Sequence, residues 1–344
     1  MSALTASREL AQPGEAHEPA ELRGHGRDDV RLLVAHRDGA IEHARFAELP
    51  ELLAPGDLLA VNTSATMPAA VPVWTSDGEL RIHLSTPARG RSDAAWLVEL
   101  RRGGHRFRGG NAGDVLLLPA GGTAVLLERF GGGRLWLASL RLPVSVPHYL
   151  ARHGEPIRYG HATRPWPLER YQTVYANAPG SAEMPSAGRA FTPELVTQLV
   201  GAGIDVAPLV LHTGVSSLEA GEMPHAEWYS VPRFTAERIN LVRALGGRVI
   251  AVGTTAVRAL ESAVGRDGRV RDREGWTDLV IEPDTPIRAV DGLLSGFHDR
   301  DSSHLAMLEA IAGADLLERS YDEAAEAGYL RHELGDLHLI LPAA

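Results

Sequence analysis

The pattern of hydrophobic and polar residues indicates β-structure from about residue 57 to about residue 140. Short apolar runs such as LLAVN and VPVW are separated by turns rich in glycine. Asp77-Gly78 lies between two β-prone runs, which is typical of a β-hairpin. Further strands are expected at Ala95–Leu100, Val115–Leu118, Thr123–Glu128 and Leu135–Leu140. Short strands joined by glycine turns predict a small antiparallel barrel or sandwich.

From about residue 190 the pattern changes to helices alternating with strands, which predicts a largely parallel sheet covered by helices. The expected helices span 193–202, 234–245, 254–264, 302–313 and 315–327, and the expected strands are Val206–Leu211, Arg248–Val252 and Leu337–Leu341. Apolar pieces at 31–34 and 57–62 join this sheet. We therefore expect an α/β fold in which 1–67 and 149–344 form the main domain and 68–148 an inserted antiparallel β-barrel.

Composition narrows the chemistry that this chain can carry. The 344 residues include no cysteine, and all 34 basic residues are arginine. Thiolate catalysis, disulfides, Schiff-base lysines and a P-loop lysine are therefore excluded. No apolar run is long enough to cross a bilayer, and the N-terminal residues lack the order of a signal peptide, so a cytoplasmic protein is expected.

Charge is unevenly distributed along the chain. The formal net charge of −10 disfavours strong nonspecific binding to a polyanion such as RNA. Seven arginines nevertheless lie between Arg81 and Arg108, against two acids in the same segment, Asp93 and Glu99. Because this segment falls within the expected barrel, the sequence leaves room for one basic surface that faces RNA.

Polar residues follow two of the expected strands where each strand ends, the position at which open α/β sheets place ligands. Gly253-Thr254-Thr255 follows the strand RVIAV and opens a helix, so its backbone amides can face a ligand. Arg258 lies one turn further along that helix. His212 ends another strand and precedes Thr213-Gly214.

Three histidines and one carboxylate on expected loops or strand ends form a candidate acid–base set: His212, His225, Glu227 and His298, with Glu222 nearby. Histidine titrates near neutral pH, which suits proton transfer, although a single histidine more often makes structural hydrogen bonds. Metal binding is the competing use of these residues. No ligand spacing such as His-x-x-x-His or HExxH supports it, so we expect no metal.

The most specific signal in the chain is the segment Glu169–Phe191, ERYQTVYANAPGSAEMPSAGRAF. Pro185 and Gly188 bend the backbone ahead of a helix, and Gly188 lets a ligand approach the main chain closely. The segment resembles the R-Y-Q-T-V-Y-A…P-T-A-G-L-H-F signature of the S-adenosylmethionine:tRNA ribosyltransferase-isomerase family of the queuosine pathway. Matching islands follow in the family's order at Arg31–Val34, Pro55–Leu59 with Asn62, Leu211–Gly214, His225–Glu227, Arg248–Arg258, Phe297-His298 and Gly335-Asp336.

The resemblance implies an activity. The family transfers and isomerises the ribosyl portion of S-adenosylmethionine onto 7-aminomethyl-7-deazaguanine in tRNA, giving epoxyqueuosine and releasing adenine and methionine. A base would remove a proton beside the sulfonium, and an acid or hydrogen-bond donor would assist the departing adenine. We expect His212 or His298 to be the base, and His225 with Glu227 to position groups or supply a proton. S-adenosylmethionine is then the co-substrate, and tRNA the partner.

The resemblance also implies which residues bind the co-substrate. They lie in the signature segment, after the strand that ends at Leu211, and in the glycine–threonine turn with its helix: Tyr171, Gln172, Met184, Pro185, Ser186, Ala187, Gly188, Gly214, Gly253, Thr254, Thr255 and Arg258. Tyr171 and Gln172 are suited to stack on a base or hydrogen-bond to it.

Several motif positions depart from the family pattern. N-D-T-R-V-I-P-A-R-L is replaced by NTSATMPAAV at 62–71, which lacks an acid and two arginines, and the histidine of P-T-A-G-L-H-F is Ala190. Arg189 is a new charge that would partly replace those lost. Two alternatives therefore stay open: an S-adenosylmethionine-dependent transferase with a small-molecule acceptor, and a catalytically silent nucleotide- or RNA-binding protein.

Overall fold

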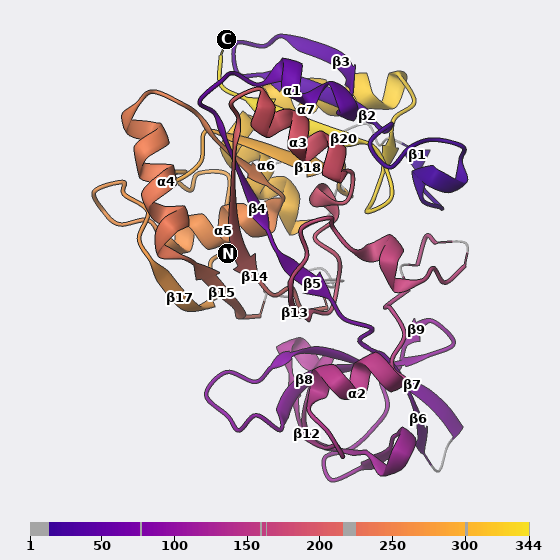
Figure 1. The fold of residues 1–344 in the computed structure, drawn as a ribbon. Helices are drawn as coiled ribbons and strands as arrows, with labels where there is room; N and C mark the ends of the chain where they lie inside the picture. The colour runs from indigo at the N-terminus through magenta and orange to yellow at the C-terminus, as the bar shows by residue number, and fades with distance from the viewer. Residues whose placement is uncertain are drawn as a thin grey trace.

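A computed structural model describes residues 14–75, 78–158, 160–162, 164–215, 225–299 and 302–343. These residues form a large mixed sheet flanked by helices, and a β-barrel that lies beyond one edge of that sheet (Figure 1). The chain passes from the sheet into the barrel after β5 (Ser64–Thr66), and β13 (Ala178–Ser181) pairs parallel with β5 on the return. None of the helices in these segments has the length and apolar content needed to cross a bilayer.

The large sheet has the strand order β17-β15-β14-β4-β16-β18-β20-β2-β3. Its adjacent strands β14, β4, β16 and β18 run parallel, and antiparallel strands extend the sheet on both sides. The strands are β2 Arg31–His36, β3 Ile41–Arg45, β4 Leu58–Asn62, β14 Asp205–Leu211, β15 Glu227–Val231, β16 Val249–Val252, β17 Arg273–Thr277, β18 Gly292–Gly296 and β20 Leu337–Leu341. The predicted α/β class is confirmed, with a mixed sheet.

The parallel strands are hydrophobic along their whole length because helices cover both faces of the sheet. Leu209 and Ala251 lie on the face that packs against α4, α5, α6 and α7, whereas Leu59 and Ile250 lie on the face that packs against α1 and α3. The helices are α1 Leu49–Leu52, α3 Pro193–Gly201, α4 Arg233–Ala244, α5 Thr254–Ala263, α6 Ser303–Ala312 and α7 Ala314–Glu326. All five predicted helices are therefore present.

The barrel closes through six antiparallel strands in the order β12-β11-β10-β6-β7-β8, with β8 pairing back to β12. The strands are β6 Ala70–Thr75, β7 Gly78–Pro87, β8 Ala95–Arg102, β10 Val115–Leu117, β11 Thr123–Phe130 and β12 Leu135–Arg141, with β9 (His105–Arg106) beside β8. Alternate residues such as Leu84, Val98 and Leu126 fill the interior. The predicted barrel is confirmed, and the domain limits at 68 and 148 remain a prediction.

The predicted hairpin joins β6 to β7, where Thr75 pairs with Gly78. Asp77 of its turn lies outside the described residues. The chain leaves the barrel through α2 (Val146–His153), which packs Tyr149 and Leu150 against the barrel interior. Near the C-terminus, β19 (Leu330–Arg331) pairs with β1 (Gly14–Glu15).

Candidate active site

The carboxyl ends of the four parallel strands meet at the edge of the sheet that faces the barrel (Figure 1). Asn62 ends β4, and its side chain is buried at this edge. Its amide nitrogen donates to the Leu211 carbonyl at 2.9 Å and to Thr255 Oγ1 at 3.1 Å, and its oxygen accepts from the Leu211 and Ser64 amides. One asparagine thereby joins β4, β14 and α5, and holds the loops that follow them.

His212 follows β14 at this edge. Its Nδ1 lies 2.8 Å from Ser64 Oγ, and its ring stacks on Trp228 at a centroid distance of 5.4 Å. Gly180 packs against the ring so closely that a Cβ there would lie 2.4 Å from it. Burial lowers the pKa of His212, although the charge of Glu227 opposes the shift. The imidazole is therefore neutral at neutral pH, as a general base must be.

Glu227 begins β15 and is the best-connected carboxylate of the site. Only 8% of its surface is exposed. Oε1 accepts from the Gly214 amide at 2.7 Å, and Oε2 accepts from Nη1 of Arg258. Arg258 Nε also donates to the Leu279 carbonyl at 3.1 Å, whereas its buried Nη2 has no hydrogen-bond partner among the described residues. A guanidinium held in this way keeps one donor for an anionic ligand.

His225 connects the sheet to the barrel. Its Nε2 lies 3.1 Å from the hydroxyl of Ser85 on β7, and the same hydroxyl accepts from the Val215 amide at 3.0 Å. Gly214 packs beneath this contact, since a Cβ there would lie 2.2 Å from His225 Nε2. One member of the predicted acid–base set, His225, therefore contacts the barrel. Nothing in the sequence around Ser85 identified this serine as its partner.

His298 follows β18, and its Nε2 lies 2.8 Å from Ser295 Oγ. Its ring lies 4.6 Å from that of His304 on α6. Burial lowers the pKa of both histidines, and His304 also senses the charges of Arg258 and Glu227. The sequence analysis missed His304, although its position in the first turn of the helix that follows His298 was a usable signal. The structure therefore brings the four predicted acid–base residues to one edge of the sheet.

The predicted ligand-binding turns also come together. The 3-10 turn at Ser186–Gly188 places Ala187 3.5 Å from the position of a Cβ on Gly253, which caps α5 ahead of Thr254. Gly188 packs against Tyr175, where a Cβ would lie 2.0 Å from the hydroxyl. Gly188 is therefore required by its close packing on Tyr175, and Gly253 by its φ of +89°. Pro185 precedes the 3-10 turn, and Thr255 binds Asn62.

Three residues of the signature segment serve the fold in this structure. Tyr171 and Met184 pack with Trp166 in a small buried cluster. Gln172 donates to the Thr66 carbonyl at 2.7 Å and accepts from the Thr66 amide at 3.0 Å, so its amide holds the strand that leads to the barrel. Their predicted contact with a base stays a prediction. Glu222 lies outside the described residues.

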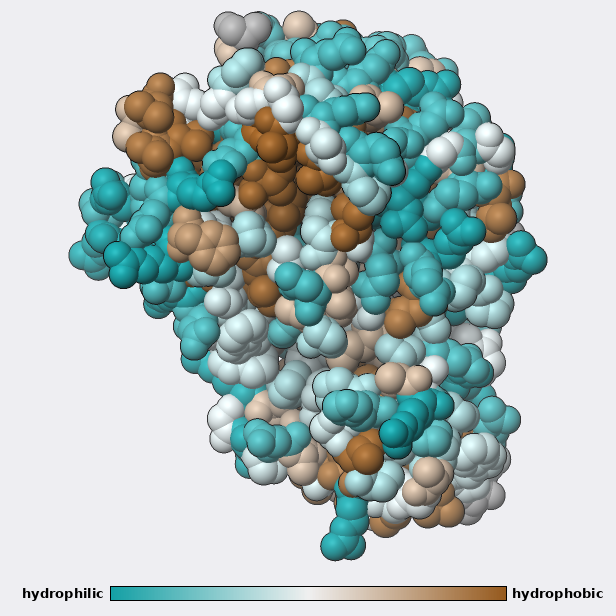
Figure 2. Space-filling view, viewed as in Figure 1, coloured by the Kyte–Doolittle hydropathy of each residue, from teal (hydrophilic) through white to brown (hydrophobic). Residues whose placement is uncertain are grey.

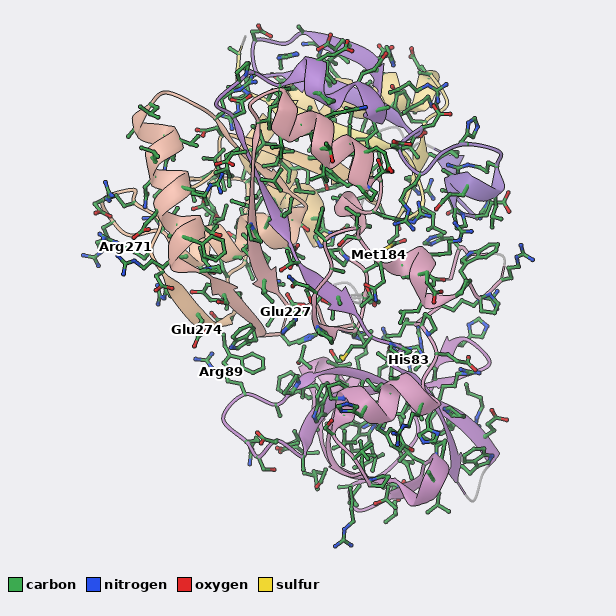
Figure 3. All side chains as sticks on the ribbon, viewed as in Figure 1. His83, Arg89, Met184, Glu227, Arg271 and Glu274 are labelled. Atoms are coloured by element: carbon green, nitrogen blue, oxygen red, sulfur yellow. The ribbon has the colours of Figure 1, made fainter. Side chains whose placement is uncertain are left out.

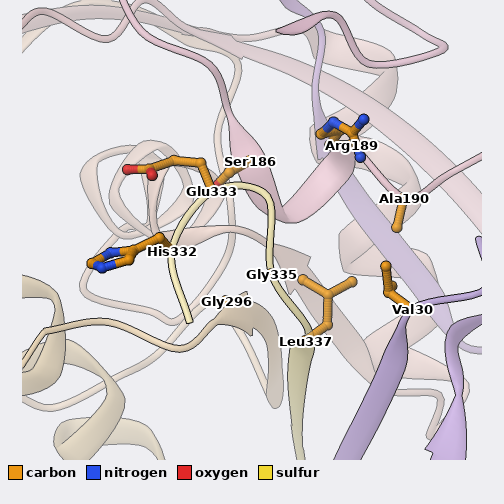
Figure 4. Close-up of a pocket in the computed structure, with 9 residues that line it drawn as sticks. All are labelled: Val30, Ser186, Arg189, Ala190, Gly296, His332, Glu333, Gly335 and Leu337. Atoms are coloured by element: carbon orange, nitrogen blue, oxygen red, sulfur yellow. The ribbon is translucent and has the colours of Figure 1, made fainter. Parts of the chain in front are cut away.

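Arg189 lines a small pocket beside the Ser186 turn (Figure 4). Its guanidinium is buried, and it donates to Glu21 Oε2 at 2.7 Å and to the Arg170 carbonyl at 2.9 Å. Glu21 also pairs with Arg27 at 3.3 Å and with Arg170 at 3.0 Å, so one carboxylate is shared among three guanidinium groups. Arg189 therefore supports the turn as part of a cluster in which arginines outnumber the carboxylate.

Four of the seven barrel arginines have acidic partners. Arg81 pairs with Glu155 at 2.6 Å, and Arg91 with Glu128 at 3.4 Å. Arg101 and Arg106 both lie beside the buried Glu99, at 3.6 and 3.3 Å. Arg89 is exposed and extends from the barrel toward the side of the large sheet, and no acid in the described segments pairs with it (Figure 3). The basic surface is therefore smaller than the count of arginines suggests.

The fold and the site define a class of protein: an α/β enzyme interrupted by a β-barrel, with neutral histidines and a buried Glu–Arg pair where the two parts meet. The family model for queuosine biosynthesis proteins matches residues 8–340, and the chain belongs to this family.

Named relatives match the chain over nearly its full length. It is 36% identical over 353 residues to the S-adenosylmethionine:tRNA ribosyltransferase-isomerase of Desulfitobacterium hafniense, covering 97% of this chain and 98% of the relative. Identity to the protein of the same name from Symbiobacterium thermophilum is 39% over 341 residues, covering 95% and 96%. The crystal structure of S-adenosylmethionine tRNA ribosyltransferase from Thermotoga maritima matches with a TM-score of 0.55 at 30% identity, covering 97% and 99%.

Proposed function

We propose that this protein transfers and isomerises the ribosyl portion of S-adenosylmethionine onto 7-aminomethyl-7-deazaguanine in tRNA, releasing adenine and methionine and leaving epoxyqueuosine. The observation that carries the proposal is the connected site at the strand ends, in a chain whose relatives bear the name of this activity. In that site Glu227 joins Arg258 to the Gly214 amide and its charge acts on His212, while the turn at Ser186–Gly188 packs on Gly253, which caps the helix that carries Arg258. S-adenosylmethionine is the co-substrate, and the reaction takes place in the cytoplasm.

His212 is the base in this proposal. The sulfonium of S-adenosylmethionine acidifies the carbon next to it, so a neutral imidazole can remove a proton there. Because Nδ1 is bonded to Ser64, Nε2 is the nitrogen that takes the proton. Glu227 stabilises the imidazolium that results, since its carboxylate already opposes the effect of burial on the pKa of His212. His298 and His304 supply the donor that assists the departing adenine.

Arg258 binds the carboxylate of the methionine portion. Its Nη1 and Nε are used by Glu227 and by the Leu279 carbonyl, so Nη2 is the donor that faces the ligand. A hydrogen bond between a guanidinium and a carboxylate contributes about 1.5–3 kcal/mol. The backbone amides at the start of α5 lie close to the Ser186–Gly188 turn, and they add partial positive charge that favours the ligand carboxylate.

A row of rings supports recognition of nucleobases. Trp228 on β15 stacks on His212 and pairs across the strands with Trp276 on β17, and both tryptophans are only half-buried. Figure 2 shows hydrophobic side chains gathered in a hollow beside α3, on the face of the sheet that holds the half-buried Val206 and Val210 of β14. Unpaired RNA bases stack on partly exposed aromatic side chains such as those of Trp228 and Trp276. Arg89 would then contact the phosphate backbone.

One observation favours a second candidate, an S-adenosylmethionine-dependent transferase with a small-molecule acceptor. Four of the seven barrel arginines are paired with acids, which leaves few cations to neutralise the phosphates of RNA.

Incubation with S-adenosylmethionine, with and without tRNA that carries 7-aminomethyl-7-deazaguanine, distinguishes the two candidates. Mass spectrometry then measures adenine, methionine and the digested nucleosides. Epoxyqueuosine with an equal amount of adenine is the expected result. Adenine without modified tRNA would support the small-molecule acceptor. Folded protein that releases no adenine under any of these conditions would overturn both candidates.

A further inference from the structure

A second group of titratable side chains borders the candidate site, next to His298 and the Ser186 turn. His161, His332 and Glu333 come from two loops far apart in the sequence, and one ligand atom from each lies within 4.8 Å of the other two. The rings of His161 and His332 stack with a centroid distance of 4.3 Å, and His161 Nε2 lies 3.1 Å from Glu333 Oε2. We call these three residues the His–His–Glu cluster.

The surroundings of the cluster are negatively charged. Glu15 Oε1 lies 3.6 Å and Asp299 Oδ1 3.8 Å from His332 Nε2. Arg331 is the cation that pairs with these two carboxylates, at 2.6 and 2.9 Å. Glu333 is a third carboxylate of this region, and Arg189, which lines the same pocket, is itself paired with Glu21. Carboxylates next to the two imidazoles favour a bound cation.

The backbone at His332 is held in an unusual conformation. Its φ is +73°, and among the described residues only Ala120 is another non-glycine residue with positive φ. Such a residue is uncommon, and strained backbone of this kind concentrates at functional sites. The conformation sends the side chains of His332 and Glu333 from adjacent positions toward the same side of the loop (Figure 4).

We propose that the His–His–Glu cluster binds one Zn²⁺ ion. Two imidazoles and a carboxylate are donors that Zn²⁺ takes, and the fourth position of a tetrahedral site would be filled by water or by the neighbouring Asp299. Two nitrogen ligands of a tetrahedral Zn²⁺ lie about 3.4 Å apart, so the three ligand atoms need to move together by about one ångström.

Binding requires a small rearrangement of the two histidines. Their rings are nearly parallel, with an interplanar angle of 10°, so their nitrogen lone pairs do not yet point at one common position. The χ2 torsion of histidine is broad, and rotation of both rings turns the nitrogens toward the ion at little energetic cost. The ion would replace the contact between His161 and Glu333, and binding should therefore weaken at acidic pH, where protons compete for the same atoms.

The test uses the full chain without an affinity tag, freed of metal by a chelator. Zn²⁺ binding is measured by equilibrium dialysis with elemental analysis, and Co²⁺ is titrated in parallel because its visible absorption reports tetrahedral coordination. We expect about one Zn²⁺ per chain and a weakening of at least about tenfold in His332→Asn and in His161→Ala. Asparagine at 332 tolerates positive φ, so that variant removes the ligand and keeps the backbone.

His25→Ala is the matched control, because His25 and Asp29 form an exposed His–carboxylate pair at 2.9 Å that lies elsewhere. It should bind Zn²⁺ like the unaltered protein. Equal loss of binding in His25→Ala, unchanged binding in both His332→Asn and Glu333→Gln, or no stoichiometric binding by the unaltered protein would each overturn the proposal. Circular dichroism of every variant establishes that it is folded, and Glu333→Gln provides the measurement if a histidine variant fails to fold.

Discussion

At the scale of single residues, the proposed acid–base site depends most on Glu227. This carboxylate accepts from the Gly214 amide and from Arg258, and its charge acts on His212 and His304. A buried charge of this kind is stable only because a paired guanidinium and a backbone amide surround it. Removing the charge therefore leaves the Arg258 guanidinium in the site without its counter-ion.

Glu227→Gln is expected to lower the rate of adenine release by about 100-fold or more, because proton transfer that involves a positioned group contributes about 10²–10⁴-fold. The glutamine still accepts from the Gly214 amide but no longer neutralises Arg258. The rate is measured by chromatography of adenine with S-adenosylmethionine and tRNA in excess. Glu274→Gln on the exposed part of β17 is the matched control and should keep the full rate. A Glu227→Gln rate within about threefold of the unaltered protein would contradict this role.

The pH dependence of stability is set in part by His338, which stacks on Phe297 inside the sheet. Burial lowers its pKa to about 3. Its pKa in the unfolded chain is about 6.5, so between the two values the unfolded chain binds one more proton than the folded protein. Stability from this residue is therefore present at neutral pH and is lost as pH falls below about 6.5.

His338→Leu is expected to reduce the slope of the unfolding free energy against pH by about 1.4 kcal/mol per pH unit between about pH 4.5 and 5.5. Urea unfolding at several pH values measures the slope. His25→Gln, at an exposed histidine, should leave it unchanged. An unchanged slope in His338→Leu would mean that His338 titrates normally in the folded protein.

At the scale of elements, Asp57 holds together the amino ends of three adjacent strands. Its carboxylate accepts from the Ala54 amide at 2.8 Å and from the amide and Nε of Arg248 at 3.1 and 3.0 Å, while its carbonyl accepts from the Asp205 amide at 2.8 Å. Burial raises the pKa of Asp57, but the hydrogen bonds from Arg248 outweigh it and the pKa lies below its usual range.

Asp57→Asn is expected to destabilise the protein by about 3 kcal/mol at neutral pH, because an amide group would face Arg248 in a buried site. The difference from the unaltered protein should shrink as pH falls through the lowered pKa of Asp57, where its carboxylate becomes protonated. Urea unfolding measures both effects. Asp284→Asn, on an exposed turn, is the control. Equal stability of Asp57→Asn and Asp284→Asn would contradict the role of Asp57.

The hydrophobic pattern predicted the strands that are buried on both faces because they are continuous apolar runs, and it predicted the helices because their apolar residues recur about every 3.6 positions. It missed β17 and β18, whose sequences REGWT and GLLSG lack a clear period and which are placed by pairing with neighbouring strands. The gathering of His212, His225 and His298 at one edge was predicted because strand ends collect there, and their acid–base roles stay a prediction. The partners Ser85 and Glu21 were not, since each contact joins distant segments that only the folded chain brings together.

At the scale of the whole molecule, the site depends on contact between the barrel and the sheet. Ser85 of the barrel meets His225 and Val215 beyond β14, and Arg134 of the barrel donates to the Val215 carbonyl at 3.3 Å. Gly214 lies at the centre of these contacts. The orientation of the two parts and the geometry of the site are therefore coupled.

Gly214→Ala is expected to reduce adenine release by about 100-fold or more, because a displacement of about one ångström at a reacting site can lower a rate by that factor. The added Cβ would lie 2.6 Å from Ser85 Oγ and closer still to His225. Gly201→Ala, where a Cβ meets nothing within 4 Å, is the matched control. A Gly214→Ala protein with a normal rate would show that the barrel can shift without affecting the chemistry.

The interruption of the sheet by the barrel has a consequence for how the chain folds. β4 is made before the barrel, but its two neighbours in the sheet, β14 and β16, lie beyond it in the chain. Contacts so distant in sequence slow folding, because the loop must close before they form. The barrel can pair its strands as soon as they leave the ribosome. The hydrophobic residues of β4 stay exposed until its partner strands β14 and β16 have been made. A barrel that folds first would shorten the effective loop between β4 and β14 and would thereby speed assembly of the sheet.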